Sequence, residues 1–242
     1  MIQAITATTL TITPSRGACG AMVEGVDLSR PLDQATIAEI RSAWLTHHVL
    51  AFPDQQVSDD ALERFSQYFG DFAGDPYLTP MPDREHVIEL RRTADETTPI
   101  FADSWHTDWS FGKQTPAATI LYGITIPPLG GNTDFINQHK ALAEMPTELR
   151  QRLENKVALH SAKLAYAPDG LYGERENDAD RGFKIRTSES ANNVQPHPLI
   201  RQHPETGEDA VFGCFGYIVG LADTPADEEQ ALLSDLYNWQ TR

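Results

Sequence analysis

The order of helical and strand-like patterns along this 242-residue chain restricts the folds open to it. Apolar residues recur at helical spacing over residues 33–48 and again over residues 58–70. From about residue 72 the chain becomes loop-like, polar and irregular, and it then shows a strong strand pattern at 117–128 and a strand–turn–strand pattern at 197–213. We see no internal repeat and no linker, so the sequence predicts one domain, α+β and mainly β, over residues 1–242.

Capping residues mark where the predicted helices begin. Asp33 or Thr36 can cap the first helix, and Ser58 can cap the second. Thr224 is the expected cap of a closing helix over residues 224–240.

Charge and cysteine content exclude several classes of partner. The formal net charge is −16, from 19 basic and 35 acidic residues, and such a surface repels phosphates of nucleic acids and anionic membranes. No segment approaches the ~18 consecutive apolar residues that span a bilayer. Two distant cysteines, Cys19 and Cys214, make no disulfide framework. We expect a soluble cytoplasmic protein that acts on a small molecule, and a homo-oligomer is left open.

The stretch "SWHTDWSF" (104–111) carries the candidate chemistry. In an extended segment, side chains at i and i+2 point to the same face, so His106 and Asp108 can share one cation. An imidazole and a carboxylate are two members of the 2-His-1-carboxylate triad that holds Fe(II) and leaves other positions open. The alternative is an exposed strand with two unrelated polar residues, and the spacing alone does not decide between them.

A longer pattern surrounds this pair. "WHTDWSFGKQTPAATILYGITIPPLGGNTDFIN" (105–137) resembles the TauD/TfdA family of 2-oxoglutarate-dependent, non-haem iron dioxygenases. Residues 20–32 and 49–70 are similar to its N-terminal signature, and residues 197–212 are similar to its later strand pair. The resemblance runs from about residue 17 to the end of the sequence.

The resemblance implies a double-stranded β-helix (jelly roll) flanked by helices. It implies Fe(II), with 2-oxoglutarate as cosubstrate and O2 as oxidant, in the hydroxylation or oxidative cleavage of a small organic substrate that releases succinate and CO2. His106 and Asp108 then become metal ligands, and Thr133 matches the threonine that holds the distal carboxylate of 2-oxoglutarate. Related halogenases lack the carboxylate, so the presence of Asp108 favours oxygen insertion.

The resemblance also implies a second histidine ligand and a 2-oxoglutarate-binding arginine on strands that follow the last helix. We therefore expect the third ligand beyond Arg242 and treat the domain as C-terminally incomplete. Alternatives within the chain are His139, His160, His197 and His203.

The substrate pocket departs from the taurine-type members. Asp75, Leu78 and Ala102 stand where those members have a His, a Tyr and an Asn, so taurine is not the expected substrate, and Trp109 can wall the pocket. The polar segment 167–195 has few apolar anchors and is a candidate lid.

Two other classes of function remain open from the sequence. One is a catalytically idle jelly-roll binding protein, since the second histidine and the arginine are not evident. The other is a Zn(II)-dependent hydrolase or isomerase that uses His106 and Asp108. Metal content and 2-oxoglutarate-dependent succinate formation distinguish the three.

Overall fold

The computed structural model describes residues 9–173 and 181–242, and the chain divides into two compact units. The first comprises the described residues up to 72 together with 120–137, and the second comprises 73–119 and the described residues from 138 onward. Each unit has a hydrophobic core of its own.

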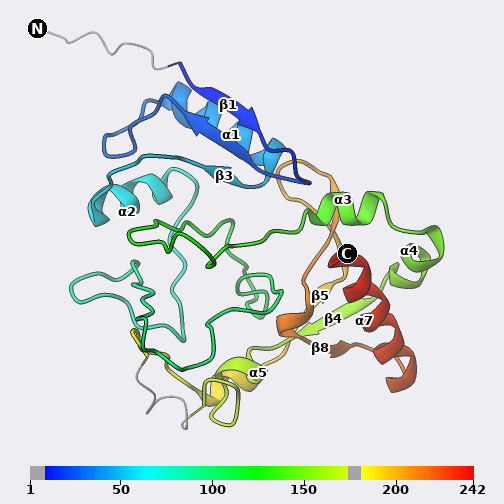
Figure 1. Ribbon diagram of the computed structural model, residues 1–242. Helices are drawn as coiled ribbons and strands as arrows, with labels where there is room; N and C mark the ends of the chain where they lie inside the picture. Colours follow the sequence, from blue (N-terminus) through cyan, green and yellow to red (C-terminus); the bar gives the residue numbers. More distant parts are fainter. Residues whose placement is uncertain (1–8, 174–180) are drawn as a thin grey trace, which may run out of the picture. The chain divides into compact units, whose positions relative to one another are not determined.

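The first unit is built on a three-stranded sheet of order β1-β2-β3 (Figure 1). β1 (Thr11–Pro14) pairs antiparallel with β2 (Ala21–Glu24), and β2 pairs parallel with β3 (Leu50–Ala51). Parallel neighbours need a crossover connection, and α1 (Gln34–His47) supplies it before α2 (Asp59–Gln67) follows. The buried side chains of this core are Leu10, Val23, Val26, Leu28, Ile40 and Phe65.

The caps of α1 and α2 confirm the predicted helix starts. Asp33 accepts a hydrogen bond from the backbone N–H of Thr36 at 2.7 Å, so Asp33 and not Thr36 is the cap of α1. Ser58 accepts from the backbone N–H of Ala61 at 3.3 Å and caps α2.

The second unit contains an antiparallel sheet of order β5-β4-β8 and a separate hairpin. The sheet consists of β4 (Val157–His160), β5 (Gln195–Pro198) and β8 (Ile218–Leu221). The hairpin joins β6 (Ile200–Gln202) to β7 (Asp209–Val211), which confirms the predicted strand–turn–strand pattern.

Three helices of the second unit contribute to its main core, namely α3 (Gln138–Ala143), α4 (Thr147–Leu153) and α7 (Ala226–Gln240). The shorter helical segments are α5 (Lys163–Tyr166), η1 (Glu189–Asn192) and η2 (Phe215–Tyr217). The buried residues of the main core are Leu142, Met145, Leu149, Leu153, Ala158, Leu199, Val211, Leu221, Leu232 and Leu236. In the described part of the chain, no helix is both long enough and apolar enough to cross a membrane.

The expected cap of the closing helix is wrong. α7 begins at Ala226, after Pro225, and no side chain caps it. The hydroxyl of Thr224 donates to the carbonyl of Ala222 at 3.0 Å instead. Three acidic residues in the first turn of α7 interact favourably with the positive end of the helix dipole.

The strand predicted at 117–128 does not form. Residues 117–128 contain no assigned strand, and Leu121, Ile124 and Ile126 are 65%, 82% and 68% exposed. A strand is stabilised by a ladder with its neighbours, and no segment of the described chain pairs with this one. Local β propensity is therefore not enough to make this segment a strand.

The segment 167–195 has buried apolar side chains in its described parts. Residues 174–180 lie outside the described residues, but Tyr172 and Ile185, on either side, are 5% and 8% exposed. Both belong to a second core of this unit, with Tyr77, Tyr166 and Tyr217. These residues anchor the described parts of the segment, and its opening as a lid stays a prediction.

Candidate active site

His106 is held by contacts at both nitrogens of its ring. Its Nδ1 lies 2.7 Å from the carbonyl oxygen of Ser104, and its Nε2 lies 3.1 Å from Oδ1 of Asp108. A carbonyl oxygen only accepts hydrogen bonds, so Nδ1 carries a proton. The lone pair of Nε2 would then point at the carboxylate of Asp108, which is unfavourable unless a proton or a metal cation lies between the two atoms. The hydrogen bond with Asp108 raises the pKa of His106, although partial burial opposes this.

Asp108 is oriented by two partners. Its Oδ1 faces His106, and its Oδ2 accepts a hydrogen bond from the hydroxyl of Thr119 at 2.6 Å. The bond with His106 is the main cause that lowers the pKa of Asp108, and the bond with Thr119 adds to it against the opposing effect of burial. The carboxylate is thus ionised at neutral pH and has a fixed direction.

The separation of Nε2 and Oδ1 fits a shared metal ion. Two adjacent ligands of an octahedral ion, each at about 2.1 Å, lie about 3.0 Å apart, and the observed distance between His106 and Asp108 is 3.1 Å. The bond from Nδ1 to a backbone carbonyl is also the usual outer contact of a metal-binding histidine. The two side chains converge although no strand is assigned at residues 104–111.

The segment η2 packs directly on the loop that carries His106. The backbone N–H of Gly216 donates to the carbonyl of Trp105 at 2.9 Å, and a Cβ at Gly216 would lie only 2.8 Å from Cβ of His106. The ring of Tyr217 lies edge-on to the imidazole of His106, with centroids 5.8 Å apart, and to Phe111 at 4.9 Å. Sequence analysis missed this contact, because it joins residues about 110 positions apart.

None of the four histidines considered as alternatives joins the pair. Each makes a hydrogen bond elsewhere, namely His139 with the carbonyl of Asp209, His160 with Ser110, His197 with the carbonyl of Gly112, and His203 with the backbone N–H groups of Glu205 and Thr206. Within residues 9–173 and 181–242, no three His, Cys, Asp or Glu side chains form a group that could hold a metal. The position of the third ligand beyond Arg242 stays a prediction.

Thr133 and Asp75 both lie outside the assigned helices and strands. Thr133 is exposed, in the first unit, just after the left-handed glycines Gly130 and Gly131. The Oδ1 atom of Asp75 accepts from the backbone N–H groups of Tyr77 and Leu78 at 2.6 and 2.7 Å, so it caps a turn. The roles of these residues stay predictions.

Three of the pocket positions differ in burial. Leu78 is buried and forms an isolated bridge with Ile185. Ala102 is exposed, with a left-handed backbone (φ 56°), and its N–H donates to the hydroxyl of Tyr172 at 3.3 Å. Trp109 is half-buried and also left-handed (φ 46°), because it lies inside the turn that follows Asp108.

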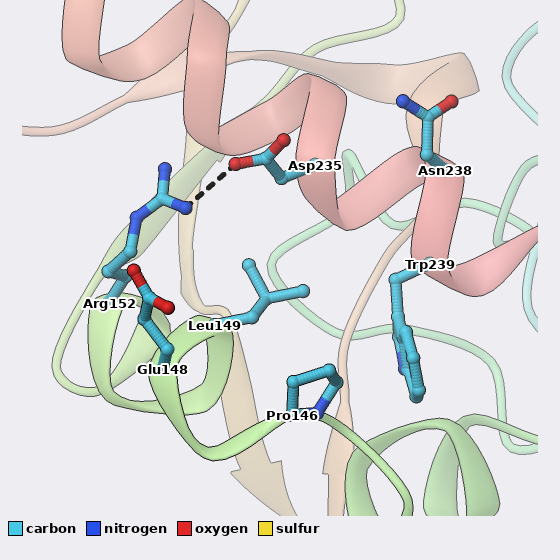
Figure 2. A pocket seen from close by; sticks show the side chains of 7 residues that line it. All are labelled: Pro146, Glu148, Leu149, Arg152, Asp235, Asn238 and Trp239. Carbon is cyan, nitrogen blue, oxygen red and sulfur yellow. Dashed lines mark hydrogen bonds and ion pairs between the residues drawn. The ribbon is translucent and has the colours of Figure 1, made fainter.

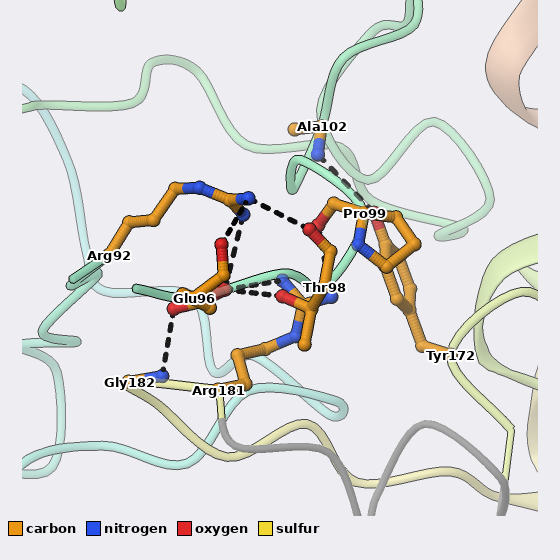
Figure 3. A network of polar contacts seen from close by, with 8 residues as sticks. All are labelled: Arg92, Glu96, Thr98, Pro99, Ala102, Tyr172, Arg181 and Gly182. Carbon is orange, nitrogen blue, oxygen red and sulfur yellow. Dashed lines mark hydrogen bonds and ion pairs between the residues drawn. The ribbon is translucent and has the colours of Figure 1, made fainter. Parts of the chain in front are cut away.

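A polar network fixes the segment that leads into the site (Figure 3). Glu96, whose side chain is 1% exposed, accepts from Arg92 at 3.1 Å, from the hydroxyl of Thr98, and from the backbone N–H of Gly182 at 3.3 Å. The bond from Thr98 is the main cause that lowers the pKa of Glu96. Arg181 approaches Glu96 at 4.0 Å and donates to the carbonyl of Pro99 at 3.1 Å. Residues 92–99 are therefore anchored to residues 181–182.

A surface groove between α4 and α7 is a separate feature of the second unit (Figure 2). Its lining includes the ion pair of Arg152 and Asp235 at 2.7 Å and the side chain of Trp239. Neither His106 nor Asp108 lines the groove. We attach no catalytic role to it.

Comparison with known proteins places the chain in a family. Residues 11–242 match the model described as "Taurine catabolism dioxygenase TauD, TfdA family". The chain belongs to this family. It is 32% identical to the alkylsulfatase of Acinetobacter baylyi over 229 aligned residues. This alignment covers 93% of the present chain and 69% of the alkylsulfatase. It is also 32% identical over 206 residues to an alpha-ketoglutarate-dependent sulfate ester dioxygenase of Pseudomonas putida, with coverage of 84% and 65%.

A solved relative shows the same fold. The crystal structure of a taurine dioxygenase from Burkholderia xenovorans superposes with a TM-score of 0.77 at 28% identity, and it covers 96% of this chain and 73% of that one. The predicted jelly-roll fold class is thereby confirmed, with helices and antiparallel sheets as the described elements. The chain spans about two thirds of the length of the two curated relatives.

The family also confirms the predicted class of enzyme, a dioxygenase dependent on alpha-ketoglutarate (2-oxoglutarate) and acting on small organic molecules. It does not support the idle binding protein or the zinc hydrolase.

Proposed function

We propose that this protein uses Fe(II), 2-oxoglutarate and O2 to hydroxylate the carbon that carries the ester oxygen of a small alkyl sulfate. The observation that carries the proposal is the convergence of His106 Nε2 and Asp108 Oδ1 at 3.1 Å, a separation that also suits two adjacent ligands of one metal ion. The substrate class follows from two relatives at 32% identity, whose names refer to sulfate esters.

Each residue has a defined part in this proposal. His106 Nε2 and Asp108 Oδ1 hold the metal, while Ser104 and Thr119 keep the two side chains in place. The hydroxyl of Thr133 donates to the distal carboxylate of 2-oxoglutarate. When bound, iron and 2-oxoglutarate supply the oxidising power that converts a substrate C–H to C–OH, with succinate and CO2 as coproducts.

The products follow from the chemistry of the substrate. Hydroxylation of R–CH2–OSO3⁻ gives R–CH(OH)–OSO3⁻, with one oxygen atom of O2 in the new hydroxyl and the other in succinate. The C–O bond to sulfate then breaks, the hydroxyl proton leaves with the sulfate, and an aldehyde remains. An alkyl sulfonate has no such ester oxygen, so a C–S bond would have to break in its place.

The surroundings of the site complete the proposal. Trp109 walls the substrate pocket, with Asp75, Leu78 and Ala102 as further lining positions, and taurine is not the substrate. The acidic chain, with a net charge of −16, acts in the cytoplasm on a small molecule, without a nucleic-acid or membrane partner. The third metal ligand and the single-domain organisation remain predictions, and the state of oligomerisation is left open.

The test is a coupled measurement of succinate and sulfate. The protein is supplied anaerobically with Fe(II) and 2-oxoglutarate, exposed to O2, and offered an alkyl sulfate or the alkyl sulfonate of equal chain length. We expect succinate and sulfate in equal amounts from the ester, and much less turnover of the sulfonate.

The matched variants are His106→Ala and Asp108→Ala, with His86→Ala and Asp103→Ala as controls, because His86 and Asp103 are exposed residues of the same unit. Both site variants should lose turnover, and both controls should keep it. Turnover within a few-fold of wild type in either site variant would refute the metal assignment. Equal turnover of ester and sulfonate would refute the substrate class.

A further inference from the structure

The turn that follows Asp108 has an unfavourable backbone. The N–H of Ser110 donates to the carbonyl of Thr107 at 3.3 Å, and that of Gly112 donates to the carbonyl of Trp109 at 2.8 Å. This geometry puts Trp109 in the left-handed region (φ 46°), which is strained for a bulky residue. The turn therefore needs support from its surroundings.

Two imidazoles on neighbouring strands give that support. His160 on β4 lies with Nδ1 2.9 Å from the hydroxyl oxygen of Ser110, and His197 on β5 lies with Nε2 3.0 Å from the carbonyl oxygen of Gly112. In the register of the two strands, Ala158 faces His197 and His160 faces Gln195. Side chains alternate along a strand, so both imidazoles project from one face of the sheet toward the turn.

Both histidines are buried and closely packed. His160 is 0% exposed and His197 is 8% exposed, and their rings lie 5.3 Å apart, edge to face. Both rings also contact Phe212, with centroids 5.6 and 5.0 Å away. A Cβ at Gly213 would lie 2.5 Å from Cε1 of His160, so the backbone of Gly213 packs directly against that ring and leaves no room for a side chain.

Packing alone does not explain the choice of histidine here. Two apolar rings would fill the same space without the cost of burying polar nitrogens, and Nε2 of His160 has no hydrogen-bond partner among the described residues. Unlike apolar rings, the imidazoles make directional hydrogen bonds to the turn. The carbonyl of Gly112 can only accept, so His197 donates to it, and His160 pairs with the hydroxyl of Ser110.

We propose that His160 and His197 are positioning residues that fix the turn 107–112 and thereby the direction in which Asp108 presents its carboxylate. This inference rests on the proposed function, since it assigns the two histidines to the support of the metal-binding pair. Neither histidine touches the metal or the two proposed ligands, and loss of their hydrogen bonds to the turn should weaken metal binding about tenfold, the lower end of the effect of groups that bond a ligand directly.

The experiment compares variants that keep or lose each hydrogen bond. His197→Gln keeps a donor near the position of Nε2, and His160→Asn keeps a polar group near that of Nδ1, whereas His197→Leu and His160→Leu keep neither. Ser110→Ala removes the partner on the turn with little change in volume, and His86→Leu is the exposed control. The readouts are Co(II) affinity, the visible spectrum of bound Co(II), and stability to urea.

We expect the Leu variants and Ser110→Ala to bind Co(II) about tenfold more weakly, with a changed spectrum. His197→Gln and His160→Asn should recover to within about threefold of wild type, and His86→Leu should not change. Wild-type affinity and spectrum in a folded Leu variant, or in Ser110→Ala if the Leu variants do not fold, would overturn the inference.

A second measurement needs no metal. Hydrogen–deuterium exchange with EDTA present should show faster exchange over residues 105–113 in His197→Leu or Ser110→Ala, and unchanged exchange over residues 138–153. Unchanged exchange at 105–113 would overturn the inference even if the protein proves to be a dioxygenase. If the wild-type protein neither binds Co(II) nor forms succinate, the proposed function fails, and the support of a metal site fails with it.

Discussion

Replacement of His160 should change how the stability of the protein depends on pH. Burial is the main cause that lowers the pKa of His160 to about 4, from an ordinary value of 6.5, and the nearby His197 adds to it. The folded protein therefore keeps this imidazole neutral between pH 6.5 and about 4, while the unfolded chain binds a proton there. Stability is then complete above pH 6.5 and is lost progressively as the pH falls toward 4.

The size of the lost stability follows from the difference between the pKa of His160 in the folded protein and its ordinary pKa. At about 1.4 kcal/mol for each pH unit, the interval from 6.5 to about 4 corresponds to about 3.5 kcal/mol of unfolding free energy. His160→Asn removes the titrating ring and keeps a polar group near Ser110. The variant should be less stable at pH 7 because it leaves a cavity, but its stability should fall less steeply below pH 6.5.

The assay is urea unfolding at several pH values between 7.5 and 4.5, with EDTA present so that metal does not compete with protons. Tryptophan fluorescence is a suitable signal, since three of the four tryptophans, Trp105, Trp109 and Trp239, belong to the second unit. His86→Asn is the control and should keep the wild-type pH dependence. Parallel curves for the wild type and His160→Asn would show that the imidazole of His160 is not held neutral by the fold, and would refute the reasoning.

Three other predictions concern the site and the core. Gly216→Ala should weaken Co(II) binding, because its Cβ would meet Cβ of His106 at 2.8 Å; Gly74→Ala, with no atom within 4 Å, should not, and equal affinities in a titration would contradict this. Co(II) affinity should fall about tenfold per pH unit below the raised pKa of His106, because one proton competes for Nε2, and a flat profile between pH 8 and 5 would exclude His106 as a ligand. Leu153→Ala, at a side chain that is 0% exposed, should cost about 3 kcal/mol in urea unfolding, whereas Leu164→Ala, at a side chain that is 54% exposed, should cost much less; similar losses would mean that the core is misassigned.

Features that depend on nearby residues could be predicted from the sequence. The caps at Asp33 and Ser58 involve atoms three residues apart, and both lie where the sequence indicates. The hairpin of β6 and β7 follows from its turn residues. A free cysteine is among the residue types that are most often buried, and Cys214 is 2% exposed, with the pKa of its thiol raised by burial.

Features that depend on distant partners could not be predicted in this way. The apolar run at 117–128 has strong β propensity, but a strand needs a neighbour, and none is specified within the run itself. The buried anchors of the segment 167–195 belong to a core that also draws on Tyr77 and Tyr217, which are far away in the sequence. Thr224 has the side chain of a typical helix cap, yet Pro225 takes the capping position of α7.

The candidate site depends on both kinds of information. The i, i+2 spacing of His106 and Asp108 is local, and the two side chains converge as that spacing indicates even though no strand is assigned there. Their orientation, however, comes from distant parts of the second unit: η2 packs on His106, and β4 and β5 hold the turn beyond Asp108. A short motif thus identifies the candidate ligands, but only the fold can bring the imidazole and the carboxylate to 3.1 Å, in an arrangement that a proton or a bound cation would stabilise.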